Sequence, residues 1–254
     1  MNLNDIPRQF GIDNCLTDFG DGLINNTYIT EDGKYVIQRI NTAVFTDPVG
    51  MTNNIIAVTD HIRSKGKTTL NFPKCGDNYY YNSGSEFWRC YEFIGDTVSY
   101  MMAPDTDCLY TEGETIGEFH RLLSDFDSSV LCESIPDFHH TKKRFETFKT
   151  ALKEDRAGRA SKVAKQADFW LSREKYAGLI IDGIEDGSIP IHVTHNDTKI
   201  NNILFDEKSG KGVCLIDLDT VMPGSYLYDY SDAIRTCAPT SAEDEIDLSK
   251  VHFS

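Results

Sequence analysis

Three polar side chains with a fixed spacing are the residues of this sequence best suited to chemistry. Asp197 is followed five residues later by Asn202, and Asp217 comes fifteen residues after that, at the end of the apolar run CLID. A carboxylate can orient an attacking hydroxyl group and accept its proton. Carboxylate and amide oxygens are also ligands for Mg²⁺, which proteins usually hold through one or two carboxylates together with substrate phosphates. The spacing therefore predicts phosphoryl transfer, with Asp197 as the base and with Asn202 and Asp217 as metal ligands.

Two further charged residues lie beside this set. Lys199 is two residues after Asp197, where its ammonium group could offset the charge of a transferred phosphoryl group. Asp219 is two residues after Asp217 and is a further candidate carboxylate for the metal. The alternative is a polar turn in which Asp197 and Asn202 bond their own backbone. The whole frame, HxDxxxxN followed by a strand that ends in IDxD, is much rarer by chance than one Asp–Asn spacing, so we favour the chemical interpretation.

Short strands are expected in the first part of the chain. The runs NNTYIT and KYVIQRIN flank the turn signal EDG, which predicts an antiparallel hairpin, and EFWRCYEFI predicts a third strand. Between the second and third runs, Met51, Ile55, Val58 and Ile62 recur at helical spacing before Gly66.

Helices are expected from about residue 97. The segments 111–126, 140–156 and 162–180 each have an amphipathic helical pattern, and IHVTH, NNILF and GVCLIDL predict short strands after them. The fold class is therefore α+β with two lobes. We expect a β-rich lobe at residues 1–94 and a mostly helical lobe at 95–254, which carries the candidate residues described above.

Composition limits the classes of protein that this chain can be. It has 254 residues with a net charge of −15, which disfavours sequence-independent binding to nucleic acid or to anionic membranes. Its seven dispersed cysteines form no CxxC pair, which is typical of reduced thiols. Because it also has neither a signal peptide nor an apolar run of membrane length, we expect a cytoplasmic protein. The oligomeric state is left open.

The string HNDTKINNILF…CLIDLD resembles the motif of the aminoglycoside phosphotransferase and choline kinase superfamily, which shares the protein-kinase fold. The longer string that ends in TVMPGSYLYDYSDAIR, together with GDGLINNTY, QRIN, WRCYEFI and GEFHRLL, is similar to the branch that contains the N-acetylhexosamine 1-kinases. The resemblance runs from about residue 18 to the end. It gives Asp197 the role of catalytic base, Asn202 and Asp217 those of metal ligands, and Asp219 that of a second carboxylate.

The resemblance also implies a segment that covers the nucleotide. Gly20 and Gly22 match glycines whose missing side chains let backbone N–H groups approach phosphates. Asn25 and Thr27 would add contacts from their side chains. Without the downstream motifs, the string GDG is equally well explained as a hairpin turn.

A cation for the phosphates is expected on the second strand. Arg39 falls where the third-strand lysine of protein kinases lies, and its planar guanidinium group suits the α- and β-phosphates of ATP. An exposed strand cation is the alternative. The glutamate that usually pairs with this cation has no counterpart, because the following helix offers only Asn53, Asn54 and Asp60.

The run Tyr91–Ile94 resembles the hinge, where backbone groups at Glu92 and Ile94 would read an adenine edge. Asp229 and Asp232 resemble structural carboxylates that brace the catalytic loop. His195 is expected to be a packed loop histidine and not a general base.

The resemblance implies an Mg²⁺- and ATP-dependent kinase that phosphorylates a small-molecule hydroxyl, with the anomeric hydroxyl of an N-acetylhexosamine as the preferred acceptor. An amino alcohol or an aminoglycoside is the alternative acceptor. Related sugar kinases continue for roughly another hundred residues, so we expect a chain truncated at its C-terminus. A truncated nucleotide-binding protein without turnover is the remaining alternative.

Overall fold

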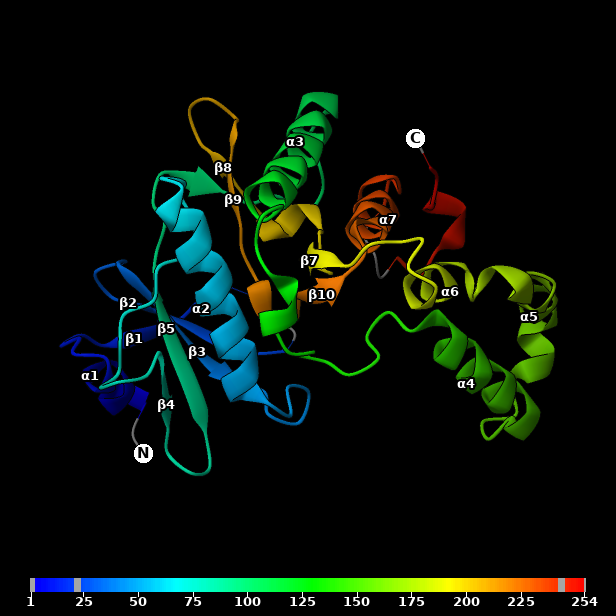
Figure 1. Ribbon diagram of the computed structural model, residues 1–254, viewed down its shortest axis with the longest axis horizontal. Helices are drawn as coiled ribbons and strands as arrows, with labels where there is room; N and C mark the ends of the chain where they lie inside the picture. The colour runs from blue at the N-terminus through cyan, green and yellow to red at the C-terminus, as the bar shows by residue number, and fades with distance from the viewer. Residues whose placement is uncertain (1–2, 21–23, 242–244, 254) are drawn as a thin grey trace. The chain divides into compact units, whose positions relative to one another are not determined.

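Five antiparallel strands form the N-terminal sheet of the computed structural model, which describes residues 3–20, 24–241 and 245–253 (Figure 1). The strand order is β1–β2–β3–β5–β4. The strands are β1 (Leu16–Asp18), β2 (Asn26–Thr30), β3 (Tyr35–Ile40), β4 (Tyr80–Asn82) and β5 (Phe87–Glu92). The hairpin expected around EDG is confirmed, because β2 and β3 pair with Asn26 opposite Arg39 and Ile29 opposite Val36.

The two faces of this sheet are covered differently. Helix α2 (Pro48–Ser64) confirms the expected helix; Asp47 caps it by accepting the amide of Gly50, and Pro48 suits its first turn. Its buried residues pack with Ile40 and Phe87 in the main core. The short helix α1 (Ile6–Gln9) joins a smaller cluster with Ile37, Trp88 and Cys90, whose side chains alternate with those of the main core. Strands β3 and β5 therefore each have one face toward the cluster of α2 and one toward the cluster of α1.

The second part of the chain combines helices with two small sheets. The sheets contain β6 (Thr97–Val98), β8 (Ile203–Asp206) and β9 (Gly212–Leu215) in one group, and β7 (His192–Thr194) and β10 (Met222–Gly224) in the other. This part includes the helices α3 (Thr106–Leu122) and α7 (Tyr226–Cys237). The expected β-rich first part and mostly helical second part are thus both present. The boundary at residue 94 stays a prediction.

Residues 136–191 form a separate compact unit, while residues 1–135 and 192–254 form the other. The separate unit contains α4 (Thr141–Glu154), α5 (Ala164–Leu171) and α6 (Leu179–Glu185). The single helix expected at 162–180 was wrong. The carbonyl of Phe169, which would accept the amide of Arg173 in a continued helix, instead accepts Ser172 Oγ at 2.8 Å and Arg173 Nη1 at 2.9 Å. The chain therefore breaks after α5.

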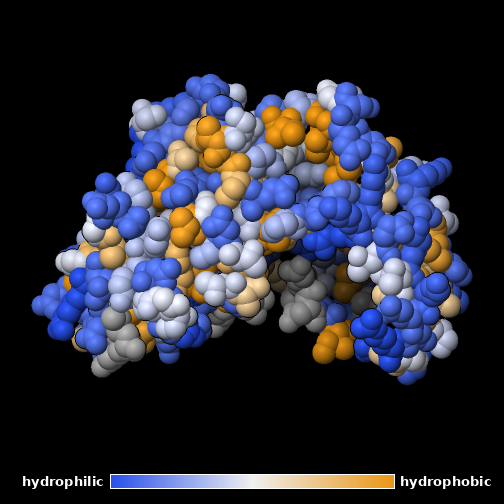
Figure 2. Space-filling view, turned by 60° about the horizontal axis from the view of Figure 1, so that its bottom comes forward, coloured by the Kyte–Doolittle hydropathy of each residue, from blue (hydrophilic) through white to orange (hydrophobic). Residues whose placement is uncertain are grey.

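One face of the surface can be followed in Figure 2. Hydrophilic residues cover most of the face in Figure 2, and hydrophobic residues lie there in small groups. Among the described residues, no helix is both long enough and apolar enough to cross a membrane.

Candidate active site

The loop between β7 and β8 brings Asp197, Lys199 and Asn202 together. Asn202 Nδ2 donates to the main-chain oxygen of Asp197 at 2.8 Å and to its carboxylate Oδ2 at 2.9 Å. Lys199 Nζ lies 3.1 Å from the same Oδ2. The Asp197 and Lys199 side chains keep 25% and 28% of their surface exposed, so both can be reached by a substrate. The loop therefore presents one oriented carboxylate beside one ammonium group.

Helix α7 fixes the backbone of this loop. The buried carboxylate of Asp229 accepts the amide of His195 at 2.9 Å and that of Asn196 at 2.6 Å. Thr198 Oγ1 donates to the Asp229 carbonyl at 2.6 Å. Asp229 thus braces the loop as expected, whereas Asp232 does not: its carboxylate pairs with the exposed Arg235.

His195 is buried and packed, as the sequence indicated. Its Nε2 is 2.9 Å from the carbonyl of Ile216, which can only accept, so Nε2 carries the proton. Its Nδ1 then accepts the amide of Asp197 at 3.3 Å. Both ring nitrogens are occupied by backbone groups, so His195 connects the loop to the strand before Asp217.

Asp217 lies where the chain leaves β9 and turns sharply. The amide of Ile216 donates to the Asn202 carbonyl at 2.8 Å, which holds the two segments together. Asp217 adopts φ 57° and ψ 53°, a left-handed conformation that is uncommon for residues other than glycine. Its carboxylate is open to solvent but has protein on most sides. This surrounding protein raises its pKa, and the negative charge of Asp219 raises it further.

The donor set fits a hard divalent cation. Asn202 uses its amide nitrogen on Asp197, and no donor among the described residues bonds its Oδ1. That oxygen and the Asp217 carboxylate are ligands of the kind that Mg²⁺ takes. No group of three or more His, Cys, Asp or Glu residues with metal-binding geometry occurs in the described parts of the chain. A metal here would therefore need oxygens from substrate or water as well.

Asp219 differs from Asp217 because its carboxylate is buried and already has partners. Arg89 Nη1 lies 2.5 Å from Asp219 Oδ1, with both side chains less than 5% exposed. Asn25 Nδ2 donates to the other oxygen at 2.7 Å. The structure thus brings Asn25 and Asp219 together, and it places Asp219 in a buried ion pair with Arg89.

The nucleotide-covering segment is described in part. Gly20 has φ 70°, which glycine adopts without strain, and Gly22 lies outside the described residues. Asn25 Oδ1 accepts the amide of Asn41 at 3.0 Å, and Thr27 Oγ1 accepts Gln38 Nε2 at 3.1 Å. The Thr27 side chain is therefore bonded within the sheet, whereas Asn25 bonds Asp219 and the residue that follows β3.

Arg39 is not brought to the acidic cluster, and this corrects the expectation from sequence. Its guanidinium group bonds Asn26 Oδ1 at 2.8 Å and Glu86 Oε1 at 3.1 Å, on the face of β3 that carries Ile37. The neighbouring Gln38 points to the opposite face, toward Arg89. Arg89, which the sequence argument missed, is the buried cation beside the carboxylates.

The hinge segment is placed at the end of β5. The amide of Glu92 donates to the Asn71 carbonyl at 2.8 Å, and the amide of Phe93 to the Lys34 carbonyl at 2.7 Å. The Ile94 carbonyl accepts Thr97 Oγ1 at 2.7 Å. These bonds order the segment. Base recognition by Glu92 and Ile94 stays a prediction.

Asn54, on α2, is bonded to the second part of the chain and not to Arg39. Its Nδ2 donates to the carbonyls of Cys132 at 2.7 Å and Val221 at 2.9 Å, and its Oδ1 accepts the amide of Cys132 at 3.0 Å. These three bonds anchor α2 in place of the ion pair known from protein kinases.

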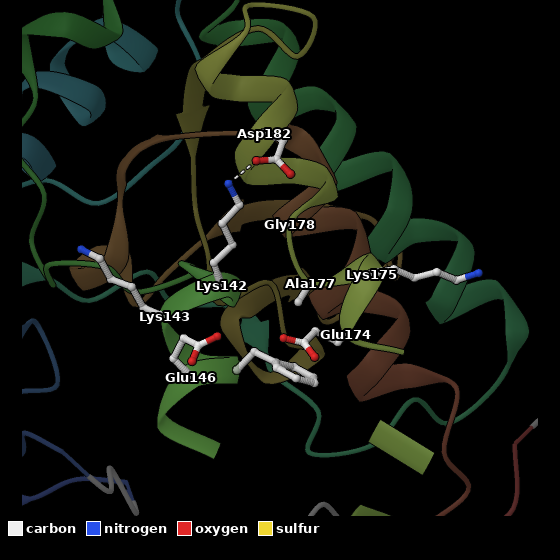
Figure 3. A pocket seen from close by; sticks show the side chains of 9 residues that line it. Lys142, Lys143, Glu146, Glu174, Lys175, Ala177, Gly178 and Asp182 are labelled. Carbon is white, nitrogen blue, oxygen red and sulfur yellow. Dashed lines mark hydrogen bonds and ion pairs between the residues drawn. The ribbon is translucent and has the colours of Figure 1, made fainter. Parts of the chain in front are cut away.

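Two cavities lie outside this cluster. One of about 490 Å³ is lined by Lys142, Glu146, Asp182 and neighbouring residues within the 136–191 unit (Figure 3). The other, of about 660 Å³, is lined by residues of α3 and β9 and by the end of α2. Neither contains a predicted site residue.

Comparison with known proteins agrees with this geometry. The sequence profile of the phosphotransferase enzyme family matches residues 16–250. Aminoglycoside 2'-phosphotransferase-IIIa, solved with GDP, is 14% identical, with a TM-score of 0.59 over 87% of this chain and 72% of that one. Aminoglycoside phosphotransferase APH(3'')-Id from Streptomyces rimosus is 13% identical, with a TM-score of 0.57 over 91% of this chain and 82% of that one. These likenesses confirm the expected two-lobed, protein-kinase-like α+β fold.

Proposed function

Because this chain belongs to the phosphotransferase enzyme family, we propose that it transfers the γ-phosphoryl group of ATP to a sugar hydroxyl, most favourably the anomeric hydroxyl of an N-acetylhexosamine. The observation that carries the proposal is the oriented carboxylate of Asp197, held by Asn202 and paired with Lys199. A general base of this kind must lie within hydrogen-bond reach of the hydroxyl proton that it accepts.

Each residue of the loop has a distinct task in this reaction. Asp197 orients the acceptor hydroxyl and takes its proton, and Asn202 keeps the carboxylate in position through its amide nitrogen. Lys199 shares its charge between Asp197 and the transferred group. Mg²⁺, held by Asn202 Oδ1 and Asp217, would supply positive charge to the phosphates of the nucleotide. Asp229 keeps the loop backbone in place for this geometry.

Sequence similarity supports the choice of an N-acetylhexosamine. The strings GDGLINNTY, QRIN, WRCYEFI and THNDTKINNILFD are spread over both parts of the chain and are similar to the sugar 1-kinase branch. A sugar hydroxyl is also a weak nucleophile, so phosphoryl transfer to it depends on a positioned base such as Asp197.

An aminoglycoside is the second candidate acceptor. A mutant of phosphotransferase APH(4)-Ia, solved with ADP and hygromycin B, is 14% identical with a TM-score of 0.53. The two structures match over 89% of this chain and 73% of that one. The net charge of −15 would attract a cationic acceptor toward the protein from solution.

A coupled assay of ADP release at saturating Mg·ATP separates these candidates. N-acetylglucosamine, N-acetylgalactosamine, glucose, choline and kanamycin are supplied one at a time, and Asp197→Asn is the matched control. We expect turnover that depends on an N-acetylhexosamine and is strongly reduced in the control. Turnover with kanamycin alone would select the aminoglycoside. If no acceptor raises ADP release in folded protein that binds Mg·ATP, both candidates are contradicted and nucleotide binding without turnover is favoured.

A further inference from the structure

Arg89 is a buried arginine whose partners all belong to the candidate site or to the sheet above it. Only 3% of its side chain is exposed, and the Asp219 side chain is 4% exposed. Burying two charges costs more free energy than their attraction returns, unless further hydrogen bonds satisfy them. Arg89 therefore needs partners for its remaining N–H groups.

Gln38 accepts hydrogen bonds from two further nitrogens of the guanidinium group. Arg89 Nε and Nη2 donate to Gln38 Oε1 at 2.9 Å and 2.6 Å, and the two residues face each other across β3 and β5. Gln38 in turn donates to Thr27 on β2. Arg89 and Gln38 together thus connect three neighbouring strands, β5, β3 and β2.

Asp219 connects this group to the segment that carries Asp217. One of its oxygens lies against Arg89 and the other accepts Asn25 Nδ2. Asn25 also accepts the amide of Asn41, at the end of β3. One oxygen of Asp219 thus accepts a hydrogen bond from Asn25, and the other makes an ion pair with Arg89 that lacks hydrogen-bond geometry. Asp217, in contrast, is open to solvent and has no ion pair with any residue that the structure describes.

We propose that Arg89 is a positioning residue that acts through Asp219: it ties the nucleotide-covering strands to the chain just after Asp217, and it leaves Asp217 and Asn202 as the protein ligands of the metal. In this assignment Arg89, and not Arg39, is the functional arginine of the sheet. Asp219 is the anchor of Arg89 and not a metal ligand. The assignment deepens the proposed function and rests on its metal–nucleotide site, but not on the identity of the acceptor.

The first test measures binding of Mn²⁺ with a non-hydrolysable ATP analogue by calorimetry in the full chain, with thermal unfolding as a check of folding. We expect Arg89→Met to weaken metal-dependent binding by about 10–100-fold, as is typical for residues that position metal ligands. Arg89→Lys should recover part of it, because lysine keeps the charge but loses the forked bonds to Gln38. Arg39→Met removes the neighbouring exposed arginine and should cost less than Arg89→Met; the reverse order would overturn the assignment.

A double-mutant cycle provides the sharper test. If Arg89 acts through Asp219, then Arg89→Met with Asp219→Asn should weaken binding about as much as either change alone. Additive losses would overturn the proposal. A second result would also overturn the proposal. In that result, Asp219→Asn weakens metal-dependent binding as much as Asp217→Asn does, while folded Arg89→Lys binds as the wild type does. Asp219 would then be a metal ligand and not the anchor of Arg89. These measurements use no acceptor, so they stand even if the acceptor assay of the proposed function fails.

Discussion

Ion pairs distinguish the three carboxylates of the candidate site. Asp197 is paired with Lys199 and Asp219 with Arg89, while Asp217 has no ion pair with any described residue. Protein around Asp217 and the charge of Asp219 raise its pKa, so a divalent cation would relieve an electrostatic cost at this residue. The residue with the least protein compensation is thus the one best suited to a metal.

Replacing Asp197 with Asn should remove the proton acceptor and leave the nucleotide site. We expect kcat to fall by roughly 10²–10⁴-fold, the usual contribution of a positioned general base. Nucleotide affinity should stay unchanged, since Asn202 and Asp217 remain. Steady-state kinetics and calorimetry check the two parts. Asp206→Asn, at the last residue of β8, where the side chain accepts the amide of Ser209, is the control, and equal kcat values for the two variants would exclude Asp197 as the base.

The sequence alone singled out Asp197, Lys199, Asn202 and Asp217, because these residues lie within one short stretch of the chain, and their roles stay predictions. It did not distinguish Arg39 from Arg89, since side chains on a strand alternate between faces and the orientation depends on which face meets α2. Arg89 lies in a different strand and reaches Asp219 only through the fold. Such long-range pairs leave no local pattern in a single sequence.

At the scale of elements, α7 is the part that holds the catalytic loop. Asp229 in its first turns accepts two buried amides of that loop, and His120 Nε2 of α3 lies 2.6 Å from the same carboxylate. Two helices and one loop therefore depend on a single side chain. The sequence predicted α7's role through Asp229 by resemblance, but it could not predict the contribution of His120.

Asp229→Ala should destabilise the protein by about 2–5 kcal/mol, because it leaves two buried N–H groups without an acceptor at about 1–3 kcal/mol each. Asp232→Ala is the matched change one helical turn later. It removes an ion pair to the exposed Arg235 and should cost at most about 1 kcal/mol. Urea unfolding measures both free energies, and similar losses in the two variants would contradict the bracing role of Asp229.

The contact between α3 and α7 should make stability depend on pH. Glu112 is buried there beside Cys237 and Asp232; burial and the negative charge of Asp232 raise its pKa from 4.5 to about 7. Below about pH 4.5 the carboxyl is protonated in both folded and unfolded chains, so its contribution to stability is fully present. Between about pH 4.5 and 7 only the unfolded chain ionises freely, and stability is lost as pH rises.

Glu112→Gln should remove this dependence. We expect the variant to gain on the order of 3 kcal/mol relative to the wild type between about pH 4.5 and 8, at 1.36 kcal/mol per pK unit. Glu114→Gln, on the exposed side of the same helix, is the control. Unfolding free energies that run parallel for wild type and Glu112→Gln across this pH range would contradict the prediction.

At the scale of the whole molecule, the two compact units differ in how much they bury. Of residues 136–191, all of which the structure describes, only Ala167 and Gly183 are fully buried. The other unit contains both hydrophobic cores. The amphipathic patterns predicted helices in both regions, but the division between the units follows from long-range packing, which periodicity does not report.

Backbone amides in the 136–191 unit should therefore exchange with solvent sooner than those of the larger unit. Regions with few buried apolar contacts open at lower free energy than the global unfolding reaction. Hydrogen exchange followed by mass spectrometry measures this, with α4 compared with α2 as helices of similar length. We expect α4 to lose protection well before α2. Equal protection in the two helices would show that the smaller unit is as stable as the core.

We propose above that Asp197 and its neighbours transfer the γ-phosphoryl group of ATP to a sugar. The most direct measurement follows γ-³²P-labelled ATP with Mg²⁺ and N-acetylglucosamine or N-acetylgalactosamine, and locates the label in wild type and in Asp197→Asn. We predict labelled sugar 1-phosphate from the wild type and at least about 10²-fold slower labelling by the variant. Absence of label from both sugars with folded, nucleotide-binding protein, or equal labelling by the variant, would contradict it.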